Sequence, residues 1–396
     1  MVAFAIRRTL GTSLVVALAT WLPAVASAQA APSAEEQRRI VAERIEQALA
    51  QGGPYSKGLI DPLMSLVELY QESGRHDLAV AATEQAMQVI RANYGLRSLD
   101  QASLMRERIR SEEERGNFGE AWDLEQALLT LASANPNDLR SAEIFREIGD
   151  KRMDLLRRYR AGEFPPQLVL GCYYLELPDH NCTYGSRRIA MSAMLTDAQR
   201  HYAVAITLML RSGQYSSAEL RGLELDLIRS TWWYGGNYQT GRQSLRRLLS
   251  YDVASDEPIA GRADALVQMA DWDLLYEHRP LALETYQETY DFLRREGVEP
   301  AAIDALFSPA LPVVLPVFEP NSLATDGGDE HIDVSFEVTR YGFADRIRVL
   351  AKTANVSEEA EGQLVRLIAR QRFRPRVVDG EFPRSTPVEL RYYVSD

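Results

Sequence analysis

The C-terminal part of the chain alternates apolar and polar residues. Between residues 332 and 338 every second position is apolar and the positions between them are polar or charged. Such a period of two predicts a strand with one buried and one solvated face. The apolar positions are Ile332, Val334, Phe336 and Val338.

The pattern beyond this strand predicts a small sheet covered by one helix. A turn at Tyr341-Gly342 leads into a second strand through Ile347 and Val349. Ser357 stands before two glutamates and an apolar series at helical spacing, as a helix N-cap does. A final alternating strand spans residues 386–394. One amphipathic helix must then cover one face of an antiparallel sheet.

This order of elements, with the run Arg372-Phe373-Arg374-Pro375-Arg376-Val377-Val378-Asp379-Gly380 before the last strand, resembles the C-terminal domain of TonB-type energy transducers. The resemblance covers about residues 330–396. In that family the domain binds an extended peptide by adding a strand to its sheet. The resemblance therefore implies that residues 386–394 offer an edge to a partner, with Tyr392 and Tyr393 on opposite faces. The candidate partner-binding residues of this strand are Val388, Leu390, Tyr392 and Tyr393.

Arginines concentrate just before the last strand. The group consists of Arg366, Arg370, Arg372, Arg374 and Arg376. One interpretation is favourable charge at a helix C-terminus followed by a solvated face. The other is contact of Arg372, Arg374 and Arg376 with an acidic partner, which includes the acidic repeats of the same chain.

Upstream, apolar residues recur at helical spacing and glycines separate the runs. Gly74 and Gly116 lie 42 residues apart, and each is followed five positions later by an alanine, Ala79 or Ala121. The pattern resembles tetratricopeptide helix pairs, in the longer form found in kinesin light chains. We expect a helical repeat domain over residues 33–300 with about five hairpins. The predicted fold class is mostly α, a tetratricopeptide-like α-solenoid followed by a small α+β TonB-like C-terminal domain.

Large aromatic residues cluster near residue 235. A turn does not require so many large aromatic side chains, which are Trp232, Trp233, Tyr234 and Tyr238. They are interpreted either as packing between repeats or as the lining of a peptide-binding groove.

Between the two predicted domains, residues 301–331 form a linker. Four prolines, Pro309, Pro312, Pro316 and Pro320, precede a polar stretch that ends near Glu330. Proline at these spacings keeps a chain extended and prevents a helix.

The first 28 residues read as a signal peptide. Arg7 and Arg8 precede an apolar core, and Ala26-Ser27-Ala28 provides a cleavage pattern of small residues. Cleavage predicts a periplasmic protein. The alternative is that residues 9–26 stay in the inner membrane as an anchor facing the periplasm.

The formal net charge of −12 makes nucleic acid an unsuitable partner. The excess of acidic residues lies before residue 332, because residues 332–396 carry 11 basic and 10 acidic side chains. The length suits two domains, each with its own core.

The chain has two cysteines, Cys172 and Cys182, ten positions apart. In an exported protein this spacing predicts a disulfide that closes a loop inserted in the repeats. A metal site with His180 is the alternative, but it lacks an evident fourth ligand.

No catalytic or cofactor motif emerges from the sequence. It contains no phosphate-binding Gly-Lys-Ser or Gly-Lys-Thr loop, no Gly-x-Ser-x-Gly elbow and no two-histidine helical motif. We therefore expect a non-enzymatic protein without a cofactor that binds proteins or peptides of the cell envelope, possible partners being outer-membrane receptors or a second copy through the sheet edge. The alternative function is a TonB-type energy transducer held in the inner membrane by residues 9–26 and driving outer-membrane transport. An enzyme within the Cys172–Cys182 insertion is a third hypothesis.

Overall fold

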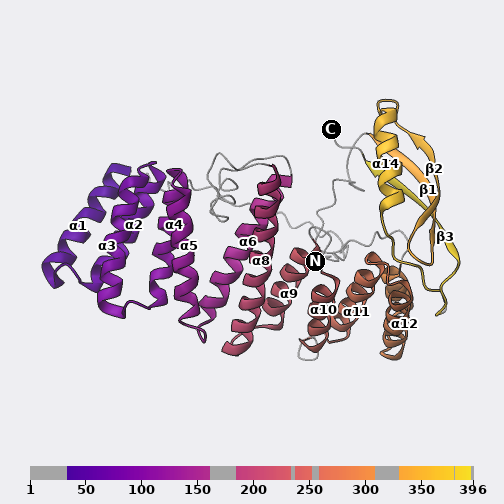
Figure 1. The fold of residues 1–396 in the computed structure, drawn as a ribbon, viewed down its shortest axis with the longest axis horizontal. Coiled ribbons are helices and arrows are strands. Elements are labelled where there is room, and N and C mark those ends of the chain that lie inside the picture. The colour runs from indigo at the N-terminus through magenta and orange to yellow at the C-terminus, as the bar shows by residue number, and fades with distance from the viewer. Residues whose placement is uncertain are drawn as a thin grey trace, which may run out of the picture.

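The computed structural model describes residues 34–160, 184–232, 237–251, 258–307, 330–378 and 380–393. Helices follow one another in a row from the N-terminal end, and a small α+β module stands at the far end of the row (Figure 1). The predicted signal peptide, the loop with Cys172 and Cys182, and most of the predicted linker lie outside the described residues.

The array contains antiparallel helix pairs. Within the described ranges, adjacent helices pack as α2 on α3, α4 on α5, α6 on α8, α9 on α10 and α11 on α12. The bounds are α1 (Ala34–Gly52), α2 (Ile60–Glu72), α3 (His76–Tyr94), α4 (Ala102–Glu114), α5 (Phe118–Ser133), α6 (Leu139–Arg160), α8 (Tyr184–Ser212), α9 (Ser217–Trp232), α10 (Tyr238–Tyr251), α11 (Pro258–Leu275), α12 (Arg279–Arg295) and α13 (Pro300–Leu306), with short 3-10 turns at Lys57–Leu59 and Leu99–Gln101. The chain is mostly helical, and these pairs make tetratricopeptide-like repeats.

The same type of turn connects the two helices of successive pairs. At Gly74 the backbone enters the left-handed region with φ of 68°, and the N–H of Arg75 donates to the carbonyl of Tyr70 at 2.8 Å. This is the hydrogen bond by which a left-handed residue ends a helix. Between α11 and α12 the left-handed residue is Glu277, with φ of 62°, and the N–H of His278 makes the equivalent bond. The sequence did not indicate this turn because it lacks a glycine.

The turn at Gly116 has the same geometry, with φ of 78°, and a small buried residue follows the turns at Gly74, Gly116 and Glu277 at a distance of five positions. Ala79, Ala121 and Ala282 are 0%, 3% and 0% exposed. A methyl group at this position lets the second helix approach the first closely, so the glycine-to-alanine spacing seen in the sequence reports helix packing.

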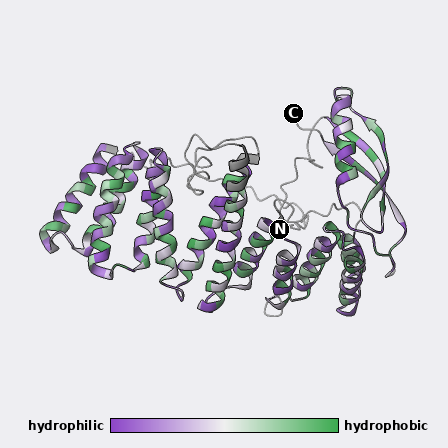
Figure 2. Cartoon of the chain, viewed as in Figure 1, coloured by the Kyte–Doolittle hydropathy of each residue, from purple (hydrophilic) through white to green (hydrophobic). Residues whose placement is uncertain are grey.

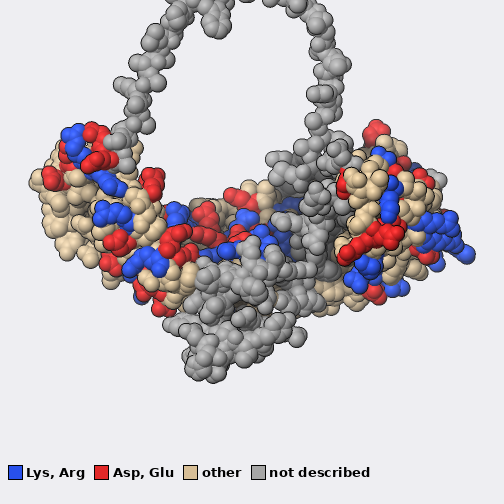
Figure 3. All heavy atoms as spheres, turned by 90° about the horizontal axis from the view of Figure 1, so that it is seen from above, with Lys and Arg blue, Asp and Glu red and all other residues tan. Residues whose placement is uncertain are grey.

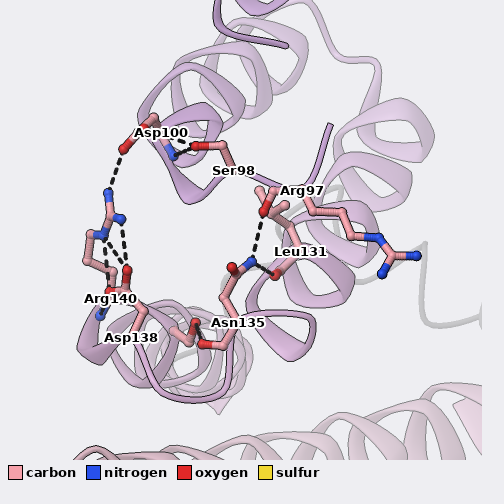
Figure 4. Close-up of polar contacts among 8 residues, drawn as sticks. Arg97, Ser98, Asp100, Leu131, Asn135, Asp138 and Arg140 are labelled. Carbon is pink, nitrogen blue, oxygen red and sulfur yellow. Dashed lines mark hydrogen bonds and ion pairs between the residues drawn. The ribbon is translucent and has the colours of Figure 1, made fainter. Parts of the chain in front are cut away.

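An asparagine also recurs with the 42-residue period. The side-chain amide of Asn93 donates to the carbonyl of Tyr55 at 2.8 Å. The side-chain amide of Asn135 donates to the carbonyl of Arg97 at 2.9 Å, as Figure 4 shows. In both cases the acceptor lies 38 residues earlier, and a second bond goes to the carbonyl four residues earlier in the asparagine's own helix. Each asparagine thus ties the C-terminal end of a helix pair to the loop that leads into the same pair.

An ion-pair bridge links the start of α6 to the 3-10 turn that precedes α4. The Nη1 of Arg140 lies 2.9 Å from the Oδ1 of Asp100, and its Nη2 lies 2.8 Å from the Oδ2 of Asp138 (Figure 4). All three side chains are about one-third to one-half exposed. The bridge therefore acts through partly solvated charges.

The array continues past its predicted end. Residues assigned to the linker form helix α13, and Phe307 beyond it is 1% exposed and packs edge-on against the rings of Tyr286 and Tyr290. Pro300 occupies the first turn of this helix, where a missing N–H costs nothing. Residues 301–307 of the predicted linker therefore pack with the array, and residues 308–329 lie outside the described residues.

The module is a three-stranded antiparallel sheet with one helix. Its strands are β1 (His331–Thr339), β2 (Ala344–Lys352) and β3 (Ser385–Tyr393), in the order β2-β1-β3, and α14 spans Glu358–Arg370. Strand β1 buries every second residue, which confirms the predicted alternation. The Oγ of Ser357 accepts the N–H of Ala360, which confirms the predicted N-cap. The apolar face of β1 packs with Leu364 and Ile368 of the helix.

Hydrophobic and hydrophilic residues both occur on each helix of the array (Figure 2). Among the described helices, none combines the length and the apolar character that a membrane span requires.

Candidate protein-binding surfaces

Strand β3 lies at an edge of the sheet. Within the described residues it pairs with β1 on one side, and no strand lies on its other side. Helix α14 packs on one face of the sheet, where Leu364 and Ile368 share a core with Val388 and Tyr392 of β3. The module therefore leaves one row of β3 main-chain groups without a strand partner.

The register identifies which groups face outward. The N–H of Arg340 donates to the carbonyl of Arg384 at 3.2 Å, so the backbone of residue 384 points toward β1. Peptide groups alternate along a strand, so residues 386, 388, 390 and 392 also point toward β1, and residues 387, 389, 391 and 393 point away from it. Two bonds at the other side of β1 agree with this phase, since His331 and Thr339 hydrogen-bond to Thr353 and Phe343 on the β2 side.

Proline limits how much of this edge can pair. Pro387 is one of the outward-facing residues and has no N–H to donate. The usable donors are therefore the N–H groups of Glu389, Arg391 and Tyr393. The opposite edge is poorly suited to pairing, because β2 has two register shifts and Arg346 sits at φ of 52°.

The predicted binding residues of β3 divide between its two faces. Val388 and Tyr392 are 6% and 5% exposed and lie in the core under α14, whereas Leu390 is half-buried at its margin. Burial raises the pKa of Tyr392 to about 12. Tyr393 lies on the other face with its ring against that of His331. The two tyrosines thus lie on opposite faces, but the side chain of Tyr392 is occupied by the module's own core.

The open face of β3 is charged. Arg391 makes a two-pronged ion pair with Asp333 on β1, at 2.7 and 2.9 Å. These hydrogen bonds hold the pKa of Asp333 below its usual value. Glu389, two residues away on the same face, is exposed and stands opposite Ser335.

A second surface lies where the module meets the array. The Arg374 guanidinium binds the Asp271 carboxylate of α11 through Nε, at 3.0 Å from Oδ1, and through Nη2, at 2.7 Å from Oδ2. The Tyr286 hydroxyl donates to the same carboxylate at 2.5 Å, and Arg374 also donates to the carbonyl of Leu306 at 3.3 Å. Asp271 is 1% exposed and Arg374 16%.

Burial and charge act together at this contact. Burial alone would lower the pKa of Arg374, but the Asp271 charge and its hydrogen bonds raise the pKa above the ordinary value for arginine. Burial, with the Asp271 charge, raises the pKa of the Tyr286 hydroxyl well above its ordinary value. The site therefore holds a charged pair whose hydrogen bonds replace the water that both groups lost.

The residues on either side of Arg374 contact both the array and the module. Val377 is 2% exposed and belongs to the apolar core of the last array helices. The N–H of Phe373 donates to the carbonyl of Gly342, and a Cβ at Gly342 would lie 2.4 Å from the carbonyl oxygen of Phe373. Arg372 lies 4.0 Å from the ring of Phe343 and reaches Glu277 at 3.2 Å, whereas Arg376 is exposed. Two of the three predicted arginines thus contact acidic residues of the chain's own repeats.

Tyr238 packs between helices. Its hydroxyl donates to Asp273 at 2.7 Å, its ring stacks on His278, and its carbonyl accepts the indole N–H of Trp272. This is the packing interpretation of the aromatic cluster and not the groove-lining one. Trp232 ends α9 and its side chain is not described, and Trp233 lies outside the described residues.

Charges of both signs are interspersed over the face shown in Figure 3, with basic side chains projecting at the outer end of the module. Among the described residues, no group of three or more His, Cys, Asp or Glu is arranged to hold a metal ion. Cys172 and Cys182 lie outside the described residues, so the disulfide stays a prediction.

Comparison with known proteins gives likeness in fold only. No protein-family model matches the sequence, and no curated protein matches it. Among solved structures, the chain is similar to nearly identical TPR-like repeats of a kinesin light chain type protein from Podosopora anserina, with 13% identity over 60% of this chain and 96% of that one and a TM-score of 0.33. It is also similar to BtubC (BKLC) from P. vanneervenii, with 14% identity over 75% and 99% and a TM-score of 0.36. The repeat character of this chain rests on its own recurring turns, small residues and asparagine bonds.

Proposed function

We propose that this chain is an exported, periplasmic, non-enzymatic protein that binds an extended peptide of a cell-envelope partner by strand addition at β3. The observation that carries the proposal is the position of β3 at the edge of the sheet, with three N–H groups directed away from β1. Main-chain pairing of this kind supplies affinity, and side-chain contacts beside the edge supply specificity.

The helical array serves as a protein-interaction scaffold in this proposal. It carries the module through the contact between Arg374 and Asp271, which holds the β3 edge in a fixed orientation to the repeats. The TonB-like order of elements supports peptide binding as the role of the sheet, and an outer-membrane receptor as one class of partner.

Removal of one outward N–H tests strand addition. In the chain that begins at Gln29, Glu389→Pro deletes a donor of the free edge and leaves the bonds to β1 in place. Glu389→Ala is the matched control, because it removes the same side chain and keeps the donor. The full repeat array is retained in both, since Val377 belongs to the array core.

Envelope proteins captured by the wild-type chain are expected to be retained by Glu389→Ala and lost with Glu389→Pro. Amide exchange of Glu389, Arg391 and Tyr393 is expected to slow in the captured complex, because these amides then donate to the guest strand. Equal capture by the proline and alanine variants, or unchanged exchange at this edge, overturns the proposal.

The alternative function is energy transduction from the inner membrane. It requires residues 9–26 to be retained, and these lie outside the described residues. Sequencing the N-terminus of the protein recovered from cells separates the two proposals: a start at Gln29 excludes the anchor, and an uncleaved leader excludes the periplasmic form.

A further inference from the structure

The free edge of β3 is complementary to itself. When two copies of residues 387–393 run antiparallel with Leu390 opposite Leu390, the facing pairs are Pro387 with Tyr393, Val388 with Tyr392, and Glu389 with Arg391. Opposite charges therefore meet on the open face, and apolar groups meet on the face that α14 covers.

The backbone phase fits the same register. An antiparallel pair exchanges hydrogen bonds only between residues that both point outward. In this register Glu389 and Arg391 face each other, and both point away from β1. Tyr393 donates to the carbonyl of Pro387, so the missing N–H of the proline costs one bond on each side. Leu390 falls on the two-fold axis at a position without hydrogen bonds between the two copies, where facing side chains lie closest.

Registers shifted by two residues are worse. An axis at Arg391 places Arg391 opposite Arg391, and an axis at Glu389 places Glu389 opposite Glu389. Like charges directly opposite each other are destabilising. A shift by one residue faces outward groups with inward ones and forms no ladder.

The charges beside the axis are available for this pairing. Arg391 is already oriented by Asp333, at 2.7 and 2.9 Å, and its side chain is half exposed. Glu389 is exposed. Pairing would place each Arg391 between Asp333 of its own chain and Glu389 of the other copy. Leu390, half-buried at the core margin, would gain an apolar neighbour.

We propose that two copies of this chain pair through β3, antiparallel about Leu390, into one continuous six-stranded sheet. This goes beyond peptide binding, because the second copy uses charge complementarity that a guest peptide does not need. It also predicts competition, since the dimer covers the same N–H groups that a peptide would use.

Charge reversal tests the register in the full chain. Glu389→Arg places arginine opposite arginine, and the double variant Asp333→Lys/Arg391→Glu places glutamate opposite glutamate while it keeps a cross-strand ion pair within each copy. Each variant alone is expected to dimerise at least about ten-fold more weakly than the wild type, as two opposite-charge pairs become like-charge pairs. Mixed together, the two variants are expected to recover a heterodimer, because arginine then faces glutamate at both positions.

Analytical ultracentrifugation over a concentration series measures these equilibria. A wild-type chain that remains monomeric throughout, or a dimer that Glu389→Arg leaves unchanged, overturns the proposal. Failure of the mixed variants to associate also overturns it, provided that each retains the wild-type circular dichroism spectrum.

A cysteine at the axis gives an independent readout. Leu390→Cys is expected to form a disulfide-linked dimer under mild oxidation, since facing residues without hydrogen bonds bring their Cβ atoms within bonding reach. Thr386→Cys, on the same strand but far from its own copy in this register, is expected not to link. The wild-type chain sets the background from Cys172 and Cys182. Equal linkage of the two variants overturns the register.

The dimer and the proposed peptide function can be distinguished, because Glu389→Arg weakens the dimer but leaves all edge N–H groups free for a guest strand.

Discussion

The contact between Arg374 and Asp271 gives the sharpest test of how the module is held. Replacement of Arg374 by alanine leaves the Asp271 carboxylate, which is 1% exposed, without its cation. Tyr286 still donates to it, but a single hydroxyl does not neutralise a buried charge. Removal of one partner of a buried ion pair costs about 3–5 kcal/mol.

The structure places the Arg374 cost at the lower end of that range. Arg374 keeps 16% of its side chain exposed, so its own desolvation is incomplete and the freed site admits water beside Asp271. We expect Arg374→Ala to lower the free energy of unfolding of the last helices and the module by about 3 kcal/mol. Arg376 supplies a matched control, because it lies two residues away and is exposed. Arg376→Ala is expected to change stability by at most about 0.5 kcal/mol.

Amide exchange measures the local effect without requiring a two-state transition of the whole chain. The N–H of Phe373, bound to the carbonyl of Gly342, and the amides of α11 and α12 report on the two sides of the contact. In Arg374→Ala their exchange is expected to accelerate by about a hundred-fold or more, as a loss of about 3 kcal/mol requires. Arg376→Ala is expected to exchange like the wild type.

A double variant separates pairing from packing. Arg374→Met with Asp271→Asn removes both charges at similar volume, and we expect it to recover most of the loss, since a buried pair replaced as a unit is often neutral. If Arg374→Ala proves as mild as Arg376→Ala, the buried pair does not hold the module to the array and the reasoning is wrong.

Two further perturbations address the array. Arg140→Met is expected to lower the free energy of unfolding by up to about 1 kcal/mol at pH 7, measured by thermal unfolding. Hydrogen bonds from Arg140 lower the pKa values of Asp100 and Asp138, so the difference from the wild type is present above the unfolded aspartate pKa of about 4 and disappears as the pH falls through the lower folded values. A difference that grows toward acid pH contradicts the bridge. Gly241→Ala is expected to destabilise by about 1–3 kcal/mol in the same assay, because its Cβ would lie 2.2 Å from the ring of Trp272, which is fully buried. Gly119→Ala, with open space at that position, is the control and is expected to be neutral or stabilising; equal effects of the two changes would refute the packing argument.

Local chemistry made much of the fold predictable. The alternation of β1 and the Ser357 cap depend on neighbours within a few residues, and the Gly74 turn requires a left-handed backbone that glycine adopts freely. The turn at Glu277 has the same geometry without that signal, so sequence alone gave only its flanking apolar positions. Helix α13 was not predicted, because the four prolines that follow it favour an extended chain.

The candidate surfaces were predictable only in part. Edge position for β3 followed from the resemblance to a known module, but the direction of its peptide groups, and hence the meaning of Pro387, depends on the register with β1. Arg374 and Asp271 lie 103 residues apart, and no period or motif connects them. Charge composition indicated that basic residues near the last strand could meet acidic repeats, and it did not indicate which ones.

The sheet topology also limits how far association through β3 can proceed. Pairing about Leu390 gives the order β2-β1-β3-β3-β1-β2, in which both β3 edges are used and the two outer edges are β2. Those outer edges carry two register shifts and a left-handed residue at Arg346, which interrupt the regular row of N–H and carbonyl groups that another strand would need. The proposed contact is therefore closed by its two-fold axis: it forms dimers and does not continue into a fibre. Light scattering that grows with concentration beyond the mass of two chains would contradict this, because it would require an edge that the module does not offer.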